Sequence, residues 1–208
     1  MNTYEQALSH RAKCLREFAC SHPELCDESG VAFWPIPVIM PLFFSQCLNL
    51  LQQEIVKLYV DNMREPANRL TEVRNLLAKL ATEGDLGEDH ASLYVADHPL
   101  LPQSFDDSHF LPHYQEVLVL NNPFKILGFL YSIEVGSLEF VKALVETGLI
   151  KKNGYFASTH LKVEVEHSNL AVLIRGIVMN ETFCLRYRSD FVFGCEFHDI
   201  VYERIADS

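Results

Sequence analysis

Positive charge is scarce in this sequence. It has 17 lysine and arginine residues against 28 aspartate and glutamate residues, which gives a formal net charge of -11. Proteins that bind nucleic acids or anionic membrane surfaces present basic patches to the phosphates. We therefore expect neither a nucleic acid nor a membrane as a partner.

The chain also lacks repeats, low-complexity tracts and runs that alternate between polar and apolar residues as strands do. Its first residues have no basic start and no apolar core, so we expect no secretory signal and a cytoplasmic protein. A length of 208 residues with 49% apolar residues is typical of one soluble globular domain. The prediction is a single all-α domain over residues 1–208.

Closely spaced cysteine pairs are absent too. None of the six cysteines belongs to a C-x-x-C pair, which argues against a structural zinc site. We interpret them as free thiols, mostly buried, and a nucleophilic role for one of them stays open. The six are Cys14, Cys20, Cys26, Cys47, Cys184 and Cys195.

One stretch without charge, Val31–Gln53, is long enough to suggest a membrane span. It contains Pro35, Pro37 and Pro41 near its start, and proline interrupts helices. We therefore interpret it as a proline-broken loop that leads into a buried helix.

Helical periodicity, with proline and glycine as boundaries, predicts seven or so helices in one bundle. Asn122-Pro123 is typical of an N-cap followed by the first helical residue. Residues 100–121 have a mixed pattern. The expected helices are Tyr4–Ser21, Leu42–Met63, Arg69–Glu83, Glu88–Asp97, Pro123–Gly148, Phe156–Met179 and Thr182–Ile205.

His160, Glu164 and His167 share one face of a predicted helix, because their spacing is H-x3-E-x2-H. That face continues as Ala171, Ile174 and Val178, and Leu161, Val165, Val172 and Leu173 make the rest of the helix apolar. We therefore expect a helix buried on nearly all sides. Buried imidazoles and carboxylates need partners, which a metal ion supplies. A hydrogen-bonded His-Glu-His cluster or a hydrated helix face is the alternative.

Three further residues extend this set. Glu83 follows Val73, Leu76, Leu77 and Leu80 on one apolar stripe, His90 comes after a glycine-containing break, and Glu134 lies inside an apolar helical run. The alternatives are a solvated helix end for Glu83, a surface position for His90 and a helix edge for Glu134. Together the six residues offer the mixed nitrogen and oxygen ligands that suit two iron or manganese ions.

In this order and spacing, the six residues resemble the haem-oxygenase-like diiron oxidases and oxygenases. The resemblance rests on Glu83-x6-His90, on Glu134 in LGFLYSIE and on His160-x3-Glu164-x2-His167, and it covers Leu70 to Met179. It implies a seven-helix haem-oxygenase-like fold, often a homodimer, that binds two Fe(II)/Fe(III) ions and no haem. Glu83, His90 and Glu134 would hold one iron, with Glu134 bridging, and His160, Glu164 and His167 the other. Glu164 departs from the commoner aspartate, and its extra methylene should alter the reach or denticity of this ligand at the second iron.

The resemblance further implies an enzyme that activates O2. Members of the family hydroxylate amines, cleave C–C bonds of fatty or amino acids, or rearrange amino acids, in some cases to nitriles. We expect a biosynthetic oxidoreductase acting on an amino acid or another small carboxylate, and an external electron donor is compatible with this chemistry. The same fold hosts metal-independent enzymes of thiamin salvage and quinone-cofactor synthesis, so such an enzyme is one alternative. A non-catalytic metal-binding or interaction protein is another.

Arg175, Tyr131 and Tyr94 are the candidates for substrate binding. Arg175 lies about 20° from Glu164 on the helical wheel and about 12 Å beyond His167 along the axis, which suits the carboxylate of an amino-acid-sized substrate. An ion pair with an acidic side chain is the alternative for Arg175. Tyr131 and Tyr94 are each near a predicted ligand, and ordinary core packing is the alternative for both.

Overall fold

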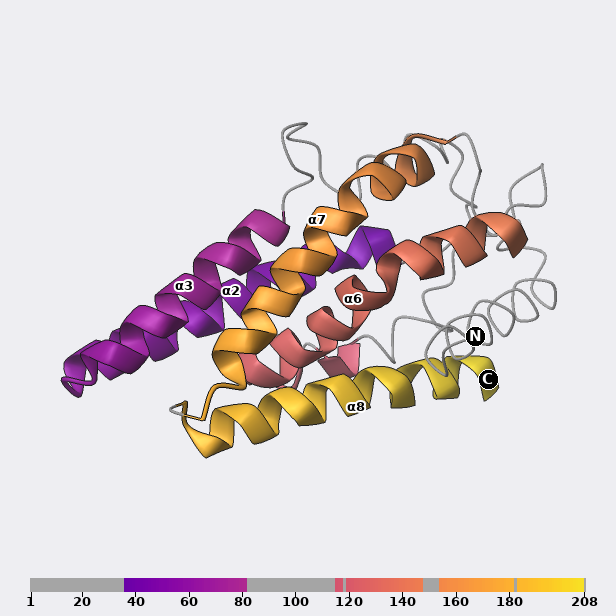
Figure 1. Cartoon of the computed structure of the whole chain (residues 1–208). Helices are drawn as coiled ribbons and strands as arrows, with labels where there is room; N and C mark the ends of the chain where they lie inside the picture. The colour runs from indigo at the N-terminus through magenta and orange to yellow at the C-terminus, as the bar shows by residue number, and fades with distance from the viewer. Residues whose placement is uncertain (1–35, 82–114, 118, 148–153, 182, 208) are drawn as a thin grey trace.

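The computed structural model describes residues 36–81, 115–117, 119–147, 154–181 and 183–207, and the regular structure in these ranges is helical throughout. This confirms the predicted all-α class for the described part. The long helices are α2 (Ile36–Val60), α3 (Arg64–Leu80), α6 (Pro123–Thr147), α7 (Tyr155–Val178) and α8 (Leu185–Asp207) (Figure 1). The predicted helices Tyr4–Ser21 and Glu88–Asp97 lie outside the described residues, so the count of seven stays a prediction.

A tight turn at residues 61–63 joins α2 to α3. Asn62 has a left-handed backbone with φ 56°, and its N–H donates to the Tyr59 carbonyl at 3.1 Å. The Met63 N–H donates to the Leu58 carbonyl at 2.8 Å, which completes a Schellman C-cap. The chain therefore reverses within three residues, and α3 returns along α2 (Figure 1).

The predicted start of α3 at Arg69 was wrong, since the helix begins at Arg64. Pro66 was expected to separate two helices, but it lies in the first turn of α3. The N–H groups of a first turn have no acceptor within the helix, so proline loses no hydrogen bond there.

The predicted loop at the start of α2 was also wrong, because α2 begins at Ile36 and contains both Pro37 and Pro41. Pro37 lies in the first turn, where proline is tolerated. Pro41 removes one hydrogen bond near the helix start. The buried neighbours Met40, Phe43 and Phe44 show that packing stabilises this turn in spite of the missing bond. In the part of the chain that the structure describes, no helix is both long and apolar enough to cross a membrane.

Asn122 caps α6 as the sequence predicts. Its Oδ1 accepts hydrogen bonds from the N–H of Phe124 at 3.0 Å and of Lys125 at 3.2 Å. Its Nδ2 donates to Asp190 of α8 at 2.9 Å. The cap therefore fixes the start of α6 and also joins it to α8.

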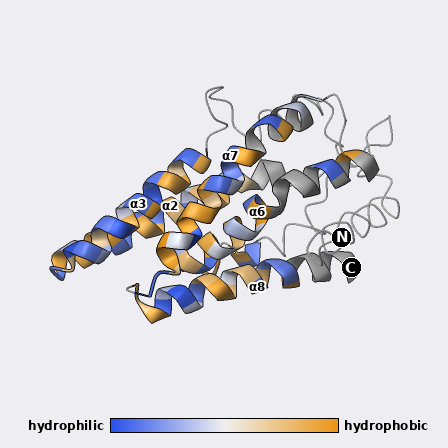
Figure 2. Ribbon diagram, viewed as in Figure 1, coloured by the Kyte–Doolittle hydropathy of each residue, from blue (hydrophilic) through white to orange (hydrophobic). Residues whose placement is uncertain are grey.

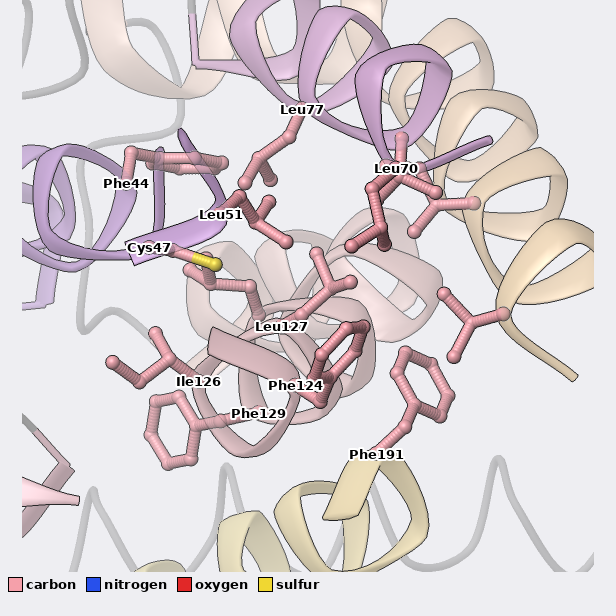
Figure 3. Packing of buried hydrophobic residues seen from close by; sticks show 14 of the residues in the cluster. Phe44, Cys47, Leu51, Leu70, Leu77, Phe124, Ile126, Leu127, Phe129 and Phe191 are labelled. Carbon is pink, nitrogen blue, oxygen red and sulfur yellow. The ribbon is translucent and has the colours of Figure 1, made fainter. Parts of the chain in front are cut away.

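α6 occupies the centre of the arrangement and contacts α2, α7 and α8, while α3 contacts α2 and α7 (Figure 1). These helices share one hydrophobic cluster, in which Phe43 of α2 meets the edge of Phe129 of α6 at 5.6 Å between ring centroids. Figure 3 shows this cluster from close by. Its members include Cys47 and Leu51 from α2, Leu70 and Leu77 from α3, Phe124 and Leu127 from α6, and Phe191 from α8.

The expectation that α7 is buried on nearly all sides was wrong. Its predicted core face is buried at Ala171, Ile174 and Val178. The opposite side is open, since Val165 is 59% and Val172 is 53% exposed. Figure 2 shows hydrophilic and hydrophobic residues interleaved along this helix. Among the described helices, α7 contacts α6, α3 and, to a small extent, α8. The hydrophobicity of a sequence alone does not decide which of its faces a neighbour covers.

Candidate metal centre

Glu134 is a carboxylate held inside the core by α6. It follows Leu127 and Leu130 at helical spacing, and both leucines are buried. Glu134 itself is only 2% exposed. Burial of a carboxylate is unfavourable unless a partner compensates for the lost hydration. The position of Glu134 therefore requires a partner close to it.

His167 lies on the neighbouring helix α7 and is equally buried, at 2% exposure. It continues the core face of α7 toward the helix start, one turn before Leu170 and Ala171. The sequence predicts this orientation correctly from the 3.6-residue period. An imidazole at such a position is available to a metal ion or a proton but not to bulk water.

The two side chains face each other across the interface between α6 and α7. Nδ1 of His167 lies 3.6 Å from Oε2 of Glu134, which is longer than a direct hydrogen bond. The next residue pair fixes the register, because the Ser168 hydroxyl donates to the Val135 carbonyl at 3.4 Å. The structure thus places one nitrogen and one oxygen ligand type side by side in a dry environment.

The other predicted ligands are not tested in the same way. His160 and Glu164 lie within helix α7, as predicted, but the structure describes only their backbone. Glu83 and His90 lie outside the described residues. Among the side chains that are described, no group of three or more His, Cys, Asp or Glu residues forms a metal site. The six-ligand centre therefore stays a prediction in which two members are seen to converge.

Two of the three predicted substrate-binding residues are described. Tyr131 is half-buried on α6 and tilts against the ring of Phe191 at 5.3 Å. Burial raises the pKa of Tyr131, and the positive charge of Arg175 lowers it in part. Arg175 is exposed on α7, and none of the described carboxylates forms an ion pair with it. Tyr94 lies outside the described residues.

The three described cysteines are free thiols, as predicted, but they are not mostly buried. Cys47 is buried, Cys195 is half-buried and Cys184 is exposed. Cys47 donates to the Pro123 carbonyl at 3.3 Å, and burial raises its pKa. A high pKa suppresses the thiolate, which argues against Cys47 as a nucleophile.

Sequence reasoning missed His198 on α8, which is 3% exposed. Its ring meets the edge of Phe129 at 5.4 Å, and its Nδ1 lies 3.2 Å from Oδ1 of Asp199. A signal was present in the sequence, because His198 follows Phe191 and Gly194 at helical spacing on the face that α8 buries. His198 is thus a second buried imidazole, in contact with α6.

Neither a family model, nor a curated protein, nor a solved structure matches this chain.

Proposed function

We propose that this protein is a non-haem diiron oxidase or oxygenase of the haem-oxygenase-like kind, acting on an amino acid or another small carboxylate. The observation that carries the proposal is the buried pair Glu134 and His167, with Nδ1 and Oε2 3.6 Å apart on adjacent helices. Helical bundles of carboxylate-bridged diiron proteins present ligands inward from facing helices in this manner. The donor types, imidazole and carboxylate, suit iron.

In this proposal Glu83, His90 and Glu134 hold one iron, and His160, Glu164 and His167 hold the other. The bound ions supply the activation of O2, chemistry that side chains alone do not provide. The chain contributes the positions of the ligands. The α6–α7 interface holds Glu134 and His167 in fixed register through Ser168 and keeps bulk water away from them. Such exclusion strengthens every electrostatic interaction inside the site.

A metal-independent enzyme is the second candidate, and the same pair favours it. A buried imidazole 3.6 Å from a carboxylate is also an arrangement for moving a proton between substrate and protein. This candidate predicts activity that survives chelators, whereas the diiron proposal predicts activity that chelators abolish and Fe(II) restores.

Iron binding tests the proposal directly. Chelator-treated protein is loaded anaerobically with Fe(II), unbound iron is removed, and iron per chain is measured for the wild type, Glu134→Gln and His167→Ala. Glu166→Gln is the matched control, because Glu166 neighbours His167 in sequence but is exposed and pairs with Lys79. Circular dichroism of each variant establishes that it is folded.

We expect about two irons per wild-type chain, the same in Glu166→Gln, and at most about half in the two site variants. The loaded wild type should consume O2 faster when the right amino acid or small carboxylate is added. Loading below one iron per chain, or folded His167→Ala that loads as the wild type does, would contradict the proposal.

A further inference from the structure

The register of α6 and α7 determines what lies beside Arg175. The two helices run antiparallel, and Ser168 of α7 is opposite Val135 of α6, as their 3.4 Å hydrogen bond shows. Arg175 is two turns further along α7 than Ser168 and lies on the same flank. Two turns back from Val135 on α6 is Gly128. The backbone of Arg175 is therefore level with Gly128.

From this level we expect the side chain of Arg175 to lean toward the candidate metal centre. Side chains on a helix lean toward its N-terminus, which for α7 is the direction of His167. On α6 that direction leads from Gly128 toward Tyr131. The electrostatic influence of Arg175 on Tyr131 agrees with this placement. Tyr131 in turn is one turn from Glu134, about 4.5 Å along the axis.

Helix α8 adds polar groups at the same level. The Cys195 thiol donates to the Gly128 carbonyl at 3.4 Å. Burial raises the pKa of Cys195, and the Ser132 side chain lowers it in part. The charge of Arg175 on α7 also lowers the pKa of Cys195 in part. Two carboxylates of α8, Glu196 and Asp199, also influence Cys195.

Those two carboxylates do not neutralise Arg175 by pairing with it. Among the described residues, the ion pairs of arginine are Arg69 with Glu65 and Arg186 with Asp190, and Arg175 has none. Arg175 is exposed, so a small solute can reach its side chain from solution. A planar group with five N–H donors and no carboxylate partner is suited to bind one bidentately.

We propose that Arg175 of α7, together with the Tyr131 hydroxyl of α6, binds the carboxylate of a small organic acid beside the Glu134–His167 pair. Arg175 supplies the charge and Tyr131 a further hydrogen bond. As a substrate-binding role, this inference rests on the proposed function. The binding itself needs no metal.

The test uses full-length, chelator-treated protein and two probes of equal size, 3-phenylpropanoate and its uncharged amide, with binding followed by isothermal titration calorimetry. The variants are Arg175→Gln and Tyr131→Phe. Arg186→Gln is the matched control, because it removes one exposed arginine charge from α8 outside the proposed site. Arg175 is exposed, so its replacement is expected to leave the fold intact, and a thermal melt establishes this.

We expect the wild type and Arg186→Gln to bind the carboxylate with Kd values within about twofold of each other. Arg175→Gln should weaken binding about tenfold or more, and Tyr131→Phe by a few fold, as for loss of a charged and a neutral hydrogen bond. The amide should bind at least about tenfold more weakly than the carboxylate to the wild type. The inference would be overturned if the wild type showed no saturable binding of the carboxylate or bound both probes equally well. It would also be overturned if a folded Arg175→Gln bound the carboxylate like the wild type.

Measuring iron loading of the same variants distinguishes a failure of this inference from a failure of the proposed function. Arg175→Gln should load as much iron as the wild type, because Arg175 is not a ligand. If the chain fails to load iron but carboxylate binding still depends on Arg175, the diiron proposal falls and the carboxylate site stands. If iron loads normally but Arg175→Gln binds the probe as the wild type does, the carboxylate site falls and the diiron proposal stands.

Discussion

Replacing Gly128 or Gly176 with alanine adds the same methyl group to a helix, yet we expect opposite effects on stability. A Cβ at Gly128 of α6 would lie 2.0 Å from the carbonyl oxygen of Phe191 and 3.0 Å from the backbone nitrogen of Cys195, both in α8. A Cβ at Gly176 of α7 would meet no atom within 4 Å. The two substitutions therefore share their chemistry and differ in the space around them.

The magnitudes follow from helix propensity and from packing. Alanine is favoured over glycine by up to about 1 kcal/mol inside a helix, and by less for Gly176 because it lies in the last turn of α7. Gly128→Ala has the same gain, but a carbon–oxygen contact needs about 3.3 Å. α6 and α8 would have to separate by roughly 1 Å, against backbone that cannot rotate away. Gly194 makes the reciprocal close approach, with its Cβ position 2.0 Å from the Lys125 carbonyl oxygen, so sliding the helices does not relieve the clash.

Overpacking of this kind costs about 1–3 kcal/mol, and a rigid backbone contact belongs at the upper end. With about 2–4 °C per kcal/mol for a chain of this size, Gly128→Ala should lower the Tm by about 5–10 °C. Gly176→Ala should raise it by about 1–3 °C.

Thermal unfolding followed by circular dichroism measures the Tm shifts, and urea unfolding measures the free energies, both on chelator-treated protein so that bound metal does not contribute to stability. The slopes of the transitions should match among the three proteins, so that midpoints report stability. If Gly128→Ala is as stable as the wild type, or if both substitutions shift the midpoint in the same direction, the close α6–α8 crossing is not the source of the constraint.

Three further predictions test other contacts. Asn122→Ala should lower the free energy of unfolding by about 1–2 kcal/mol because it removes the cap of α6. Asn122→Ser should recover part of this loss in the same unfolding assay, and an equal loss in both variants would show that the cap is not the cause. The hydrogen bond from Lys79 and the charge of Lys79 lower the pKa of Glu166 in the folded protein. The pair of Lys79 and Glu166 therefore stabilises the fold at a pH above the pKa of Glu166 in the unfolded chain, and this contribution is lost as the pH falls through the lowered pKa of the folded protein. The stability difference between wild type and Glu166→Gln should therefore close on acidification, and a difference that stays constant with pH would refute the assignment. Peptide mapping after brief treatment with a thiol reagent should find Cys184 modified and Cys47 intact until urea unfolds the protein, because Cys47 is buried with a raised pKa; early modification of Cys47 would contradict its burial.

The start of α6 was predictable because local chemistry sets it. Asn122-Pro123 predicts the start of α6 because the asparagine oxygen caps its own helix, a contact that spans only three residues. The start of α3 was mispredicted at Pro66 because a proline can follow the end of one helix or lie in the first turn of the next. The turn at Asn62 decides that Pro66 lies in the first turn of α3. Pro41 misled because the packing of Phe43 and Phe44 outweighs one missing hydrogen bond.

For the candidate site, the sequence by itself determined which way the side chains point. The 3.6-residue period set His167 on the core face of α7 and Glu134 on the apolar face of α6, and both are buried. A helical period fixes angles about an axis but not which neighbours lie at those angles. Only the tertiary structure decided that Glu134 meets His167 and that α7 is exposed along Val165 and Val172. The contact between Glu134 and His167 joins residues more than 30 positions apart and depends on how α6 and α7 pack against each other. The close approach of α6 and α8 likewise depends on Gly128 and Gly194, whose missing side chains leave room for the facing backbone.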